Sequence, residues 1–310
     1  MKQYYVADGH CDFLFGAVQY GYEIGKHKGG QSITLPRMQA GNVALQLFAA
    51  WIDTSFRTPP LQQCIAMIDA YHRMLEQNDC LVPLTRDFQP GNGKIATLLT
   101  VEGGEATEGS LAVLRVLYDL GVRAMMLTWN ENNELAGAAL AKGNKGLSSL
   151  GLEIIDEMNR IGMAIDVSHL SDRGIDDVLA RSKQPIFASH SNARDVFSSP
   201  RSLTDTQIRA IAEQGGVIGV NFYHKQLTSK RLASIDNIVA HIAHIAKVGG
   251  VDCCAIGSDF DGMQVYPTDL RDSRDFPALF AALERAGFSS ADVQKIAYDN
   301  LTSYLKKFVK

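Results

Sequence analysis

Short apolar runs recur eight times along the chain, and most of them are continuous rather than alternating with polar residues. The runs at 43–51 and 216–222 contain no charged residue, which is typical of parallel strands that are covered on both faces. We therefore predict strands at residues 4–10, 43–51, 94–101, 123–128, 162–168, 185–189, 216–222 and 253–258.

Helical periodicity fills seven of the eight gaps that follow these runs. Leu61, Ile65 and Ile68 share one face of a predicted helix. Thr204-Asp-Thr-Gln207 has the capping-box pattern of a helix start. The exception is the first gap, residues 13–42, which is rich in glycine. We predict that this gap forms a loop or short hairpin over one mouth of the fold rather than a full helix.

Strands that alternate with helices eight times favour an α/β fold, a single (β/α)8 barrel of the TIM type, over an open doubly wound sheet. No glycine-rich phosphate loop follows a predicted strand, so a nucleotide-binding fold gains no support. The sequence shows no linker, internal repeat or low-complexity segment. We predict one barrel domain over residues 1–310, with its functional site at the C-terminal ends of the strands.

The composition is that of an ordinary globular protein, with 310 residues, 46% hydrophobic and 21% charged, and a formal net charge of −4. Without a basic stripe, nucleic acid is not an expected partner. No apolar run could span a bilayer and no signal core precedes the first strand, so no membrane association is expected. Five scattered cysteines suggest reduced thiols in a cytoplasmic protein. A homodimer is one assembly open to such a barrel.

Ionisable side chains stand at or just beyond the ends of five predicted strands, namely His10, Asp12, Glu102, His169, His190 and Asp259. Because the C-terminal ends of barrel strands meet at one mouth, these side chains are expected to converge. Clustered carboxylates repel one another and burial disfavours their ionised form, so a cation is needed. The set exceeds the three protein ligands of one catalytic zinc and suits two metal ions that share a carboxylate.

At these motifs the sequence resembles the membrane, or renal, dipeptidase family of zinc peptidases, which are amidohydrolase-like enzymes. The resemblance covers nearly the whole chain. Each motif is modest by itself, but the ordered set is specific: Asp8-Gly-His-Cys-Asp12, Val101-Glu-Gly-Gly104, Asp166-Val-Ser-His169, Ser189-His-Ser191 and Gly257-Ser-Asp-Phe-Asp-Gly262.

The resemblance implies a dinuclear zinc site and the hydrolysis of small peptides. In it, His10 and Asp12 would hold one Zn²⁺, and His169 and His190 would hold the other. Glu102 would bridge the two ions. A hydroxide between the two ions would attack the peptide bond. The implied substrates are dipeptides, including those with a D-residue at the C-terminal position.

By the same resemblance, Asp259 would handle the proton of the attacking water, and Arg201 would bind the C-terminal carboxylate of the peptide. The chain departs from the family pattern at two places. Trp129 stands where the best-known members have a histidine, and its indole can only donate a hydrogen bond. Gln226 occupies the register of a substrate-contacting tyrosine, with Tyr223 nearby.

Two alternatives remain open at this stage. Trp129 and Gln226 are compatible with a related metal-dependent amidohydrolase that acts on another amide or ester, for instance an N-acyl amino acid. The chain could also be a barrel that keeps a metal but has lost catalysis, although all six candidate ligands and proton carriers are present. Turnover of dipeptides would distinguish a dipeptidase from the other amidohydrolase. Loss of activity on chelation and its return with zinc would exclude a barrel without catalysis.

Overall fold

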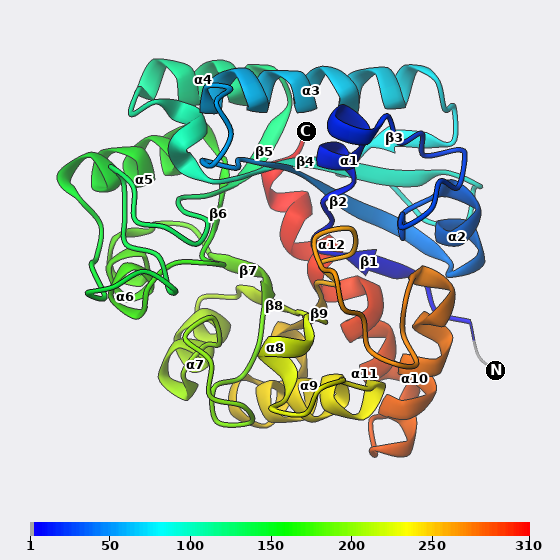
Figure 1. The fold of residues 1–310 in the computed structure, drawn as a ribbon. Helices are drawn as coiled ribbons and strands as arrows, with labels where there is room; N and C mark the ends of the chain where they lie inside the picture. The colour runs from blue at the N-terminus through cyan, green and yellow to red at the C-terminus, as the bar shows by residue number, and fades with distance from the viewer. Residues whose placement is uncertain (1–2) are drawn as a thin grey trace.

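A computed structural model describes residues 3–310 and shows a closed barrel of eight parallel strands surrounded by helices (Figure 1). The predicted (β/α)8 fold is confirmed. Each of the eight predicted runs overlaps one strand of the barrel. The strands are β1 (Val6–Asp8), β2 (Val43–Trp51), β4 (Ile95–Glu102), β5 (Val122–Met126), β6 (Ala164–Asp166), β7 (Phe187–Ser191), β8 (Val217–Val220) and β9 (Cys254–Ile256).

The ring closes because β1 pairs with both β2 and β9, while β2 pairs directly with β4. One further strand, β3 (Leu81–Pro83), was not predicted. It pairs with the first half of β4, at Leu81 opposite Ile95, whereas β5 pairs with the second half from Leu99 onward. The long strand β4 therefore pairs with both β3 and β5 along the same edge. Its last residue, Glu102, projects into the mouth of the barrel.

Helices cover the outside of the barrel (Figure 1). They are α1 (Phe13–Tyr20), α2 (Leu35–Ala40), α3 (Pro60–Glu76), α4 (Leu111–Asp119), α5 (Ser149–Ile161), α6 (Asp172–Arg181), α7 (Asp205–Glu213), α8 (His224–Leu227), α9 (Ile235–Gly249), α10 (Phe276–Arg285), α11 (Ser290–Gln294) and α12 (Asn300–Leu305). The predicted capping box at the start of α7 is present, with Thr204 and Gln207 bonded reciprocally.

The prediction for residues 13–42 is wrong, because this gap contains the helices α1 and α2. Gly16 lowers helix propensity in α1, but a side chain there would overlap the ring of Tyr22, so the close approach requires glycine. Helix α2 starts at a cap in which Thr34 accepts a hydrogen bond from the Arg37 N–H. Only the segment between the two helices is the expected loop.

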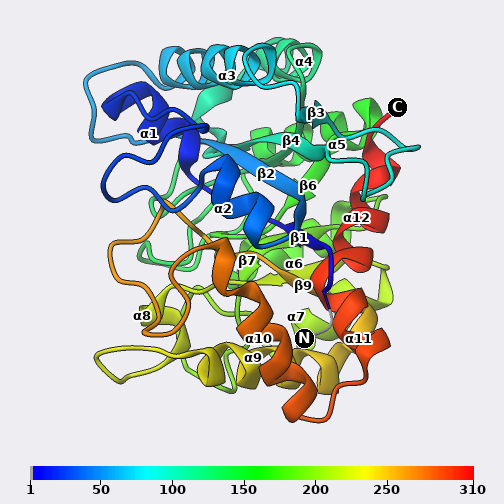
Figure 2. The same ribbon diagram turned by 90° about the vertical axis from the view of Figure 1, so that its right-hand side faces the viewer.

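The end of the barrel opposite α1 and α8 is closed by the C-terminal segment (Figure 2). Tyr304 and Phe308 belong there to one apolar cluster with strand residues that are small, such as Ala7, or large, such as Leu47 and Phe187. These larger side chains fill the space that the alanines leave, so this end of the barrel is a packed apolar core. The ionisable side chains predicted for the site gather in the open half, at the C-terminal strand ends.

Within residues 3–310, no helix is long and apolar enough to cross a membrane. The five cysteines are free thiols, and four of them are buried. The single-domain organisation, the cytoplasmic location, the homodimer and the absence of a nucleic-acid partner stay predictions.

His241 in α9 is a buried histidine that serves the fold. Its Nδ1 accepts a hydrogen bond from the Ala193 N–H at 3.1 Å, and its Nε2 lies 3.3 Å from the Leu227 carbonyl oxygen. The ring therefore ties the segment after β7 to α8. Burial lowers the pKa of His241 to about 4, below the ordinary value of 6.5.

We expect His241 to make folding pH-dependent. Between pH 6.5 and about 4 the unfolded chain binds this proton and the folded chain does not, so stability falls as pH falls. From about pH 8 to about pH 5 this group alone removes about 2 kcal/mol. Urea unfolding should show that difference between the wild type and His241→Gln, whose amide can replace both hydrogen bonds. Identical losses in the two proteins would contradict the assignment.

Candidate active site

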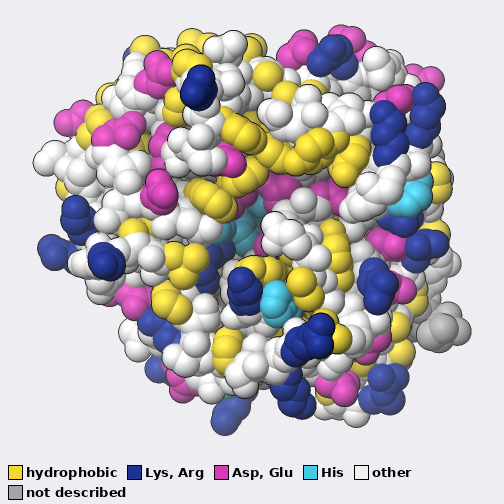
Figure 3. Space-filling view, in the orientation of Figure 1, with side chains coloured by type: hydrophobic (Ala, Val, Ile, Leu, Met, Phe, Trp, Pro, Cys, Tyr) yellow, Lys and Arg dark blue, Asp and Glu magenta, His cyan; other side chains and the backbone are white. Residues whose placement is uncertain are grey.

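A cavity of about 540 Å³ opens at the C-terminal ends of the barrel strands. Figure 3 shows a hollow in the centre of this face, with acidic and histidine side chains at its floor and hydrophobic side chains around it. Five carboxylates line the cavity, namely Asp12, Asp53, Glu102, Asp259 and Asp261. The guanidinium of Arg201 also lines it. The cavity lining therefore holds more acidic than basic side chains.

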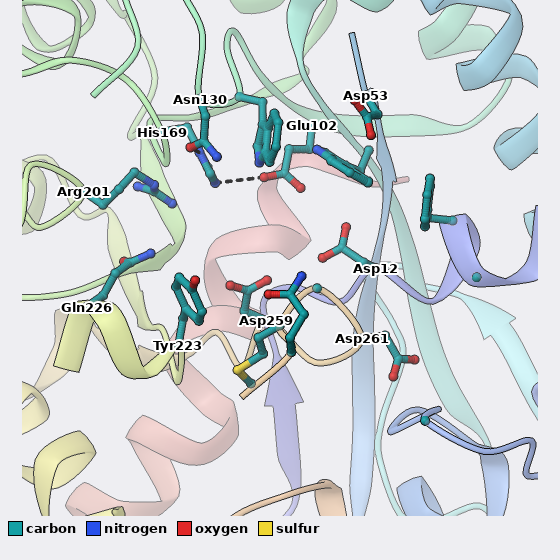
Figure 4. Close-up of a pocket in the computed structure, with 18 of the residues that line it drawn as sticks. Asp12, Asp53, Glu102, Asn130, His169, Arg201, Tyr223, Gln226, Asp259 and Asp261 are labelled. Atoms are coloured by element: carbon teal, nitrogen blue, oxygen red, sulfur yellow. Dashed lines mark hydrogen bonds and ion pairs between the residues drawn. The ribbon is translucent and has the colours of Figure 1, made fainter. Parts of the chain in front are cut away.

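Six predicted side chains meet at the floor of this cavity. His10 and Asp12 follow β1, Glu102 ends β4, His169 lies three residues beyond β6, His190 belongs to β7, and Asp259 follows β9. All are buried except Asp259, which is partly buried. The sequence prediction that they converge is correct, and Figure 4 shows Asp12, Glu102, His169 and Asp259 facing a common space.

The histidine nitrogens and carboxylate oxygens that could bind a metal form two groups around Glu102. On one side, His169 Nε2 lies 2.9 Å from Glu102 Oε1 and 2.9 Å from His190 Nε2. On the other side, His10 Nε2 lies 3.2 Å from Glu102 Oε2 and 3.4 Å from Asp12 Oδ2. Each oxygen of the one carboxylate thus faces a different pair of side chains.

Hydrogen bonds from two further residues, Asn130 and Ser189, orient the imidazole rings of His169 and His190. Asn130 Oδ1 lies 2.9 Å from His169 Nδ1, and Ser189 Oγ lies 2.9 Å from His190 Nδ1. Because Asn130 Oδ1 can only accept, His169 carries its proton on Nδ1 and turns the Nε2 lone pair toward the cavity. Sequence reasoning assigned no role to Asn130 or Ser189, although each adjoins a predicted site residue in the chain.

Asp259 is held in a similar way. Asn221, the residue after β8, donates a hydrogen bond to Asp259 Oδ2 at 3.0 Å. The backbones of Asp259 and His169 both adopt the left-handed conformation, with φ of 64° and 71°. Non-glycine residues rarely adopt it, and such strain persists only where the surroundings fix it. Here the sharp bend after each strand turns the side chain back over the barrel mouth.

Burial and neighbouring charges shift the pKa values of several ionisable side chains around Glu102. Burial alone would lower the pKa of His10, but the carboxylates of Glu102 and Asp12 outweigh burial and raise this pKa well above its ordinary value. Burial raises the pKa of Asp259 to about 7, and the carboxylates of Asp12 and Glu102 act in the same direction. Burial, with a contribution from the Arg201 charge, lowers the pKa of His169 to about 4.

The donor set fits a divalent metal ion. Neutral His169 directs a lone pair at an oxygen of Glu102 only 2.9 Å away, and two acceptors at that distance repel unless a cation lies between them. His10 Nδ1 is buried and has no hydrogen-bond partner within the described chain, while His10 Nε2 faces only carboxylate oxygens there. Tetrahedral ligands at about 2.0–2.1 Å from a zinc ion lie about 3.3 Å from one another, close to the distances seen here.

The predicted substrate-binding residues line the same cavity. Arg201 is buried, forms no ion pair within residues 3–310, and leaves its Nε without a partner there. Burial lowers the pKa of Arg201 to about 10. Gln226 and Tyr223 lie beside Arg201 in Figure 4. Trp129 also lines the cavity, with its ring centroid 6.5 Å from that of His169.

Histidine and carboxylate donors at the strand ends of a (β/α)8 barrel define the class of metal-dependent hydrolases. Within that class the chain belongs to the membrane dipeptidase family (peptidase family M19), whose family model matches residues 1–308. The resemblance found in the sequence motifs is confirmed.

Two curated relatives support this assignment. The chain is 36% identical over 298 residues to an uncharacterized dipeptidase of Schizosaccharomyces pombe, covering 88% of this chain and 71% of the relative. It is 31% identical over 315 residues to dipeptidase 3 of Rattus norvegicus, covering 97% of this chain and 64% of the relative. The chain therefore spans about two thirds of the length of these proteins.

A solved structure resembles the whole fold. A metallo peptidase from Rhodobacter sphaeroides, bound to a phosphinate mimic of the dipeptide L-Ala-D-Ala, superposes with a TM-score of 0.90 at 25% identity. The match covers 99% of this chain and 100% of that one. The two proteins thus share their complete barrel architecture.

Gly262 permits the close approach of the two carboxylates on one side of the site. A Cβ atom there would overlap Asp12 Oδ2 and would lie 2.5 Å from Asp259 Oδ1. At Gly29, by contrast, an added Cβ would meet nothing within 4 Å.

We expect Gly262→Ala to displace Asp12 and to weaken zinc binding by about 10-fold or more, as changes beside metal ligands commonly do. The measurement is zinc affinity by competition with a chelator, and Gly29→Ala is the matched control. Circular dichroism should show both variants folded. Equal zinc affinity in Gly262→Ala and the control would contradict a metal site at Asp12.

Proposed function

We propose that the protein is a zinc-dependent dipeptidase with a dinuclear site, which cleaves the peptide bond of small dipeptides. The main support is the position of Glu102. Its two oxygens face two separate pairs of donors, His169 with His190 and His10 with Asp12. Each pair with one oxygen of Glu102 offers three protein ligands, the number typical of a catalytic zinc.

In this proposal, His10, Asp12 and Glu102 Oε2 would hold one ion, and His169, His190 and Glu102 Oε1 the other. When bound, zinc supplies an acidified water molecule and polarises the scissile carbonyl. The protein contributes orientation, because Asn130 and Ser189 fix the ring nitrogens that face the cavity.

Asp259 is suited to moving the proton. Its Oδ2 already accepts a hydrogen bond from Asn221, so Oδ1 is the atom left to exchange a proton with the reacting groups. A carboxyl with its pKa raised toward neutral can accept a proton from water and return it to the leaving amine. Trp129 cannot share this task, because an indole has no basic nitrogen.

Arg201 is suited to binding the C-terminal carboxylate of the dipeptide. Its guanidinium is buried beside the cavity and has no carboxylate partner among the described residues, and a buried cation without a partner is costly. A substrate carboxylate would supply that partner through two hydrogen bonds and would fix the length of the peptide. The bound L-Ala-D-Ala mimic in the Rhodobacter sphaeroides protein supports including peptides with a C-terminal D-residue.

The proposal is tested by turnover of a panel of L,L- and L,D-dipeptides together with N-acetyl amino acids. We expect hydrolysis of dipeptides, loss of activity after chelation, and recovery at about two equivalents of zinc per chain. Turnover of the N-acetyl compounds alone would favour the alternative amidohydrolase, which Trp129 and Gln226 keep open. No turnover of any amide by the zinc-loaded protein would indicate a barrel without catalysis.

For Arg201 we expect a substrate-specific defect. Arg201→Gln should lower kcat/KM for a dipeptide by about 100-fold, since losing one partner of a buried charge pair costs about 2–5 kcal/mol. The C-terminal amide of the same dipeptide lacks the carboxylate and should lose far less. A uniform loss on both substrates would mean that Arg201 acts on the fold or the metals instead.

A further inference from the structure

Aromatic rings from three separate parts of the chain form a continuous wall along the cavity. Trp129, after β5, has its ring centroid 4.9 Å from that of Trp51 at the end of β2. Trp51 in turn lies 4.8 Å from Phe15 of α1, and Phe15 stacks on Phe56 with an interplanar angle of 9°. All four residues line the cavity. We call these four residues the aromatic wall.

The wall begins next to the predicted metal ligands and ends at the rim. Trp129 is the ring adjacent to His169, while Phe56 at the other end is 41% exposed. Trp51 and Trp129 are only half-buried. Large apolar rings that remain open to a cavity gain free energy when a ligand covers them.

The cavity is therefore divided into two ends of opposite character. Arg201 and Gln226 lie on the opposite side of Glu102 from Asp53 (Figure 4), and Asp53 is two residues beyond Trp51 in the chain. A dipeptide with its carboxylate at Arg201 and its peptide bond over Glu102 would extend its N-terminal residue toward the aromatic wall. The wall offers edges and faces of rings, to which aromatic and large aliphatic side chains bind.

Resting on the dipeptidase function proposed above, we propose that the aromatic wall binds the side chain of the N-terminal residue of the substrate. Trp51, Trp129 and Phe15 then select dipeptides whose N-terminal residue is aromatic or large and apolar. This also gives Trp129 a role that needs no basic nitrogen.

The test compares Phe-Ala with Gly-Ala, which share the C-terminal residue and the scissile bond. Apolar pockets discriminate by about 10–200-fold for small differences in side-chain size. We expect the wild type to prefer Phe-Ala by about 10-fold or more in kcat/KM, and Trp51→Leu and Phe15→Leu each to remove most of that preference. Turnover of Gly-Ala by these variants should change by less than about 3-fold.

Phe288→Leu is the matched control for Phe15→Leu, because Phe288 is a partly buried phenylalanine outside the cavity. It should keep the wild-type ratio, and thermal unfolding should show that the variants are folded. The use of two wall variants guards against one of them failing to fold.

Hydrolysis of both peptides without a preference for Phe-Ala, or a preference that survives in both wall variants, would overturn this inference and leave the dipeptidase function standing. Hydrolysis of neither peptide by the zinc-loaded protein, together with no turnover across the wider panel, would overturn both.

Discussion

The rest of this structure depends on one constraint, which is that several hydrogen-bond acceptors lie close together around the buried carboxylate of Glu102. Glu102 is nearly inaccessible to solvent, yet each of its oxygens faces the ring nitrogen of a histidine at about hydrogen-bond distance. Lone pairs and negative charges at such distances destabilise the fold unless positive charge joins them. The closed barrel holds them together because each of these residues lies within a strand or no more than four residues beyond its end.

A layer of hydrogen-bonded polar groups behind the histidines makes this arrangement specific. Asp166 accepts hydrogen bonds from the N–H groups of Ser168 and Ser189, and Ser168 in turn accepts one from the His190 N–H. Ser189 contacts the ring of His190 itself. The ends of β6 and β7 are thereby locked to each other, so the two histidines that follow or occupy them keep a fixed separation.

In the proposed function, the two ends of the cavity bind different parts of the substrate. A buried guanidinium offers a strong and directional partner for a carboxylate, whereas stacked rings accept any apolar shape of suitable size. Trp129 belongs to the second kind of surface. Trp129 lies outside the set formed by Glu102 and the five ionisable residues around it, which are all in place.

The sequence by itself determined the barrel and the identity of its polar mouth, because strand periodicity and the direction of a parallel strand are local properties that place residues such as His10 and Glu102 at one rim. Tertiary structure alone decided what depends on distant neighbours. Helix α1 forms despite Gly16 because Tyr22 packs on that glycine, and Asn130 orients His169 from another segment. Likewise, Trp51 meets Trp129 only because the closed ring brings β2 and β5 to opposite edges of β4.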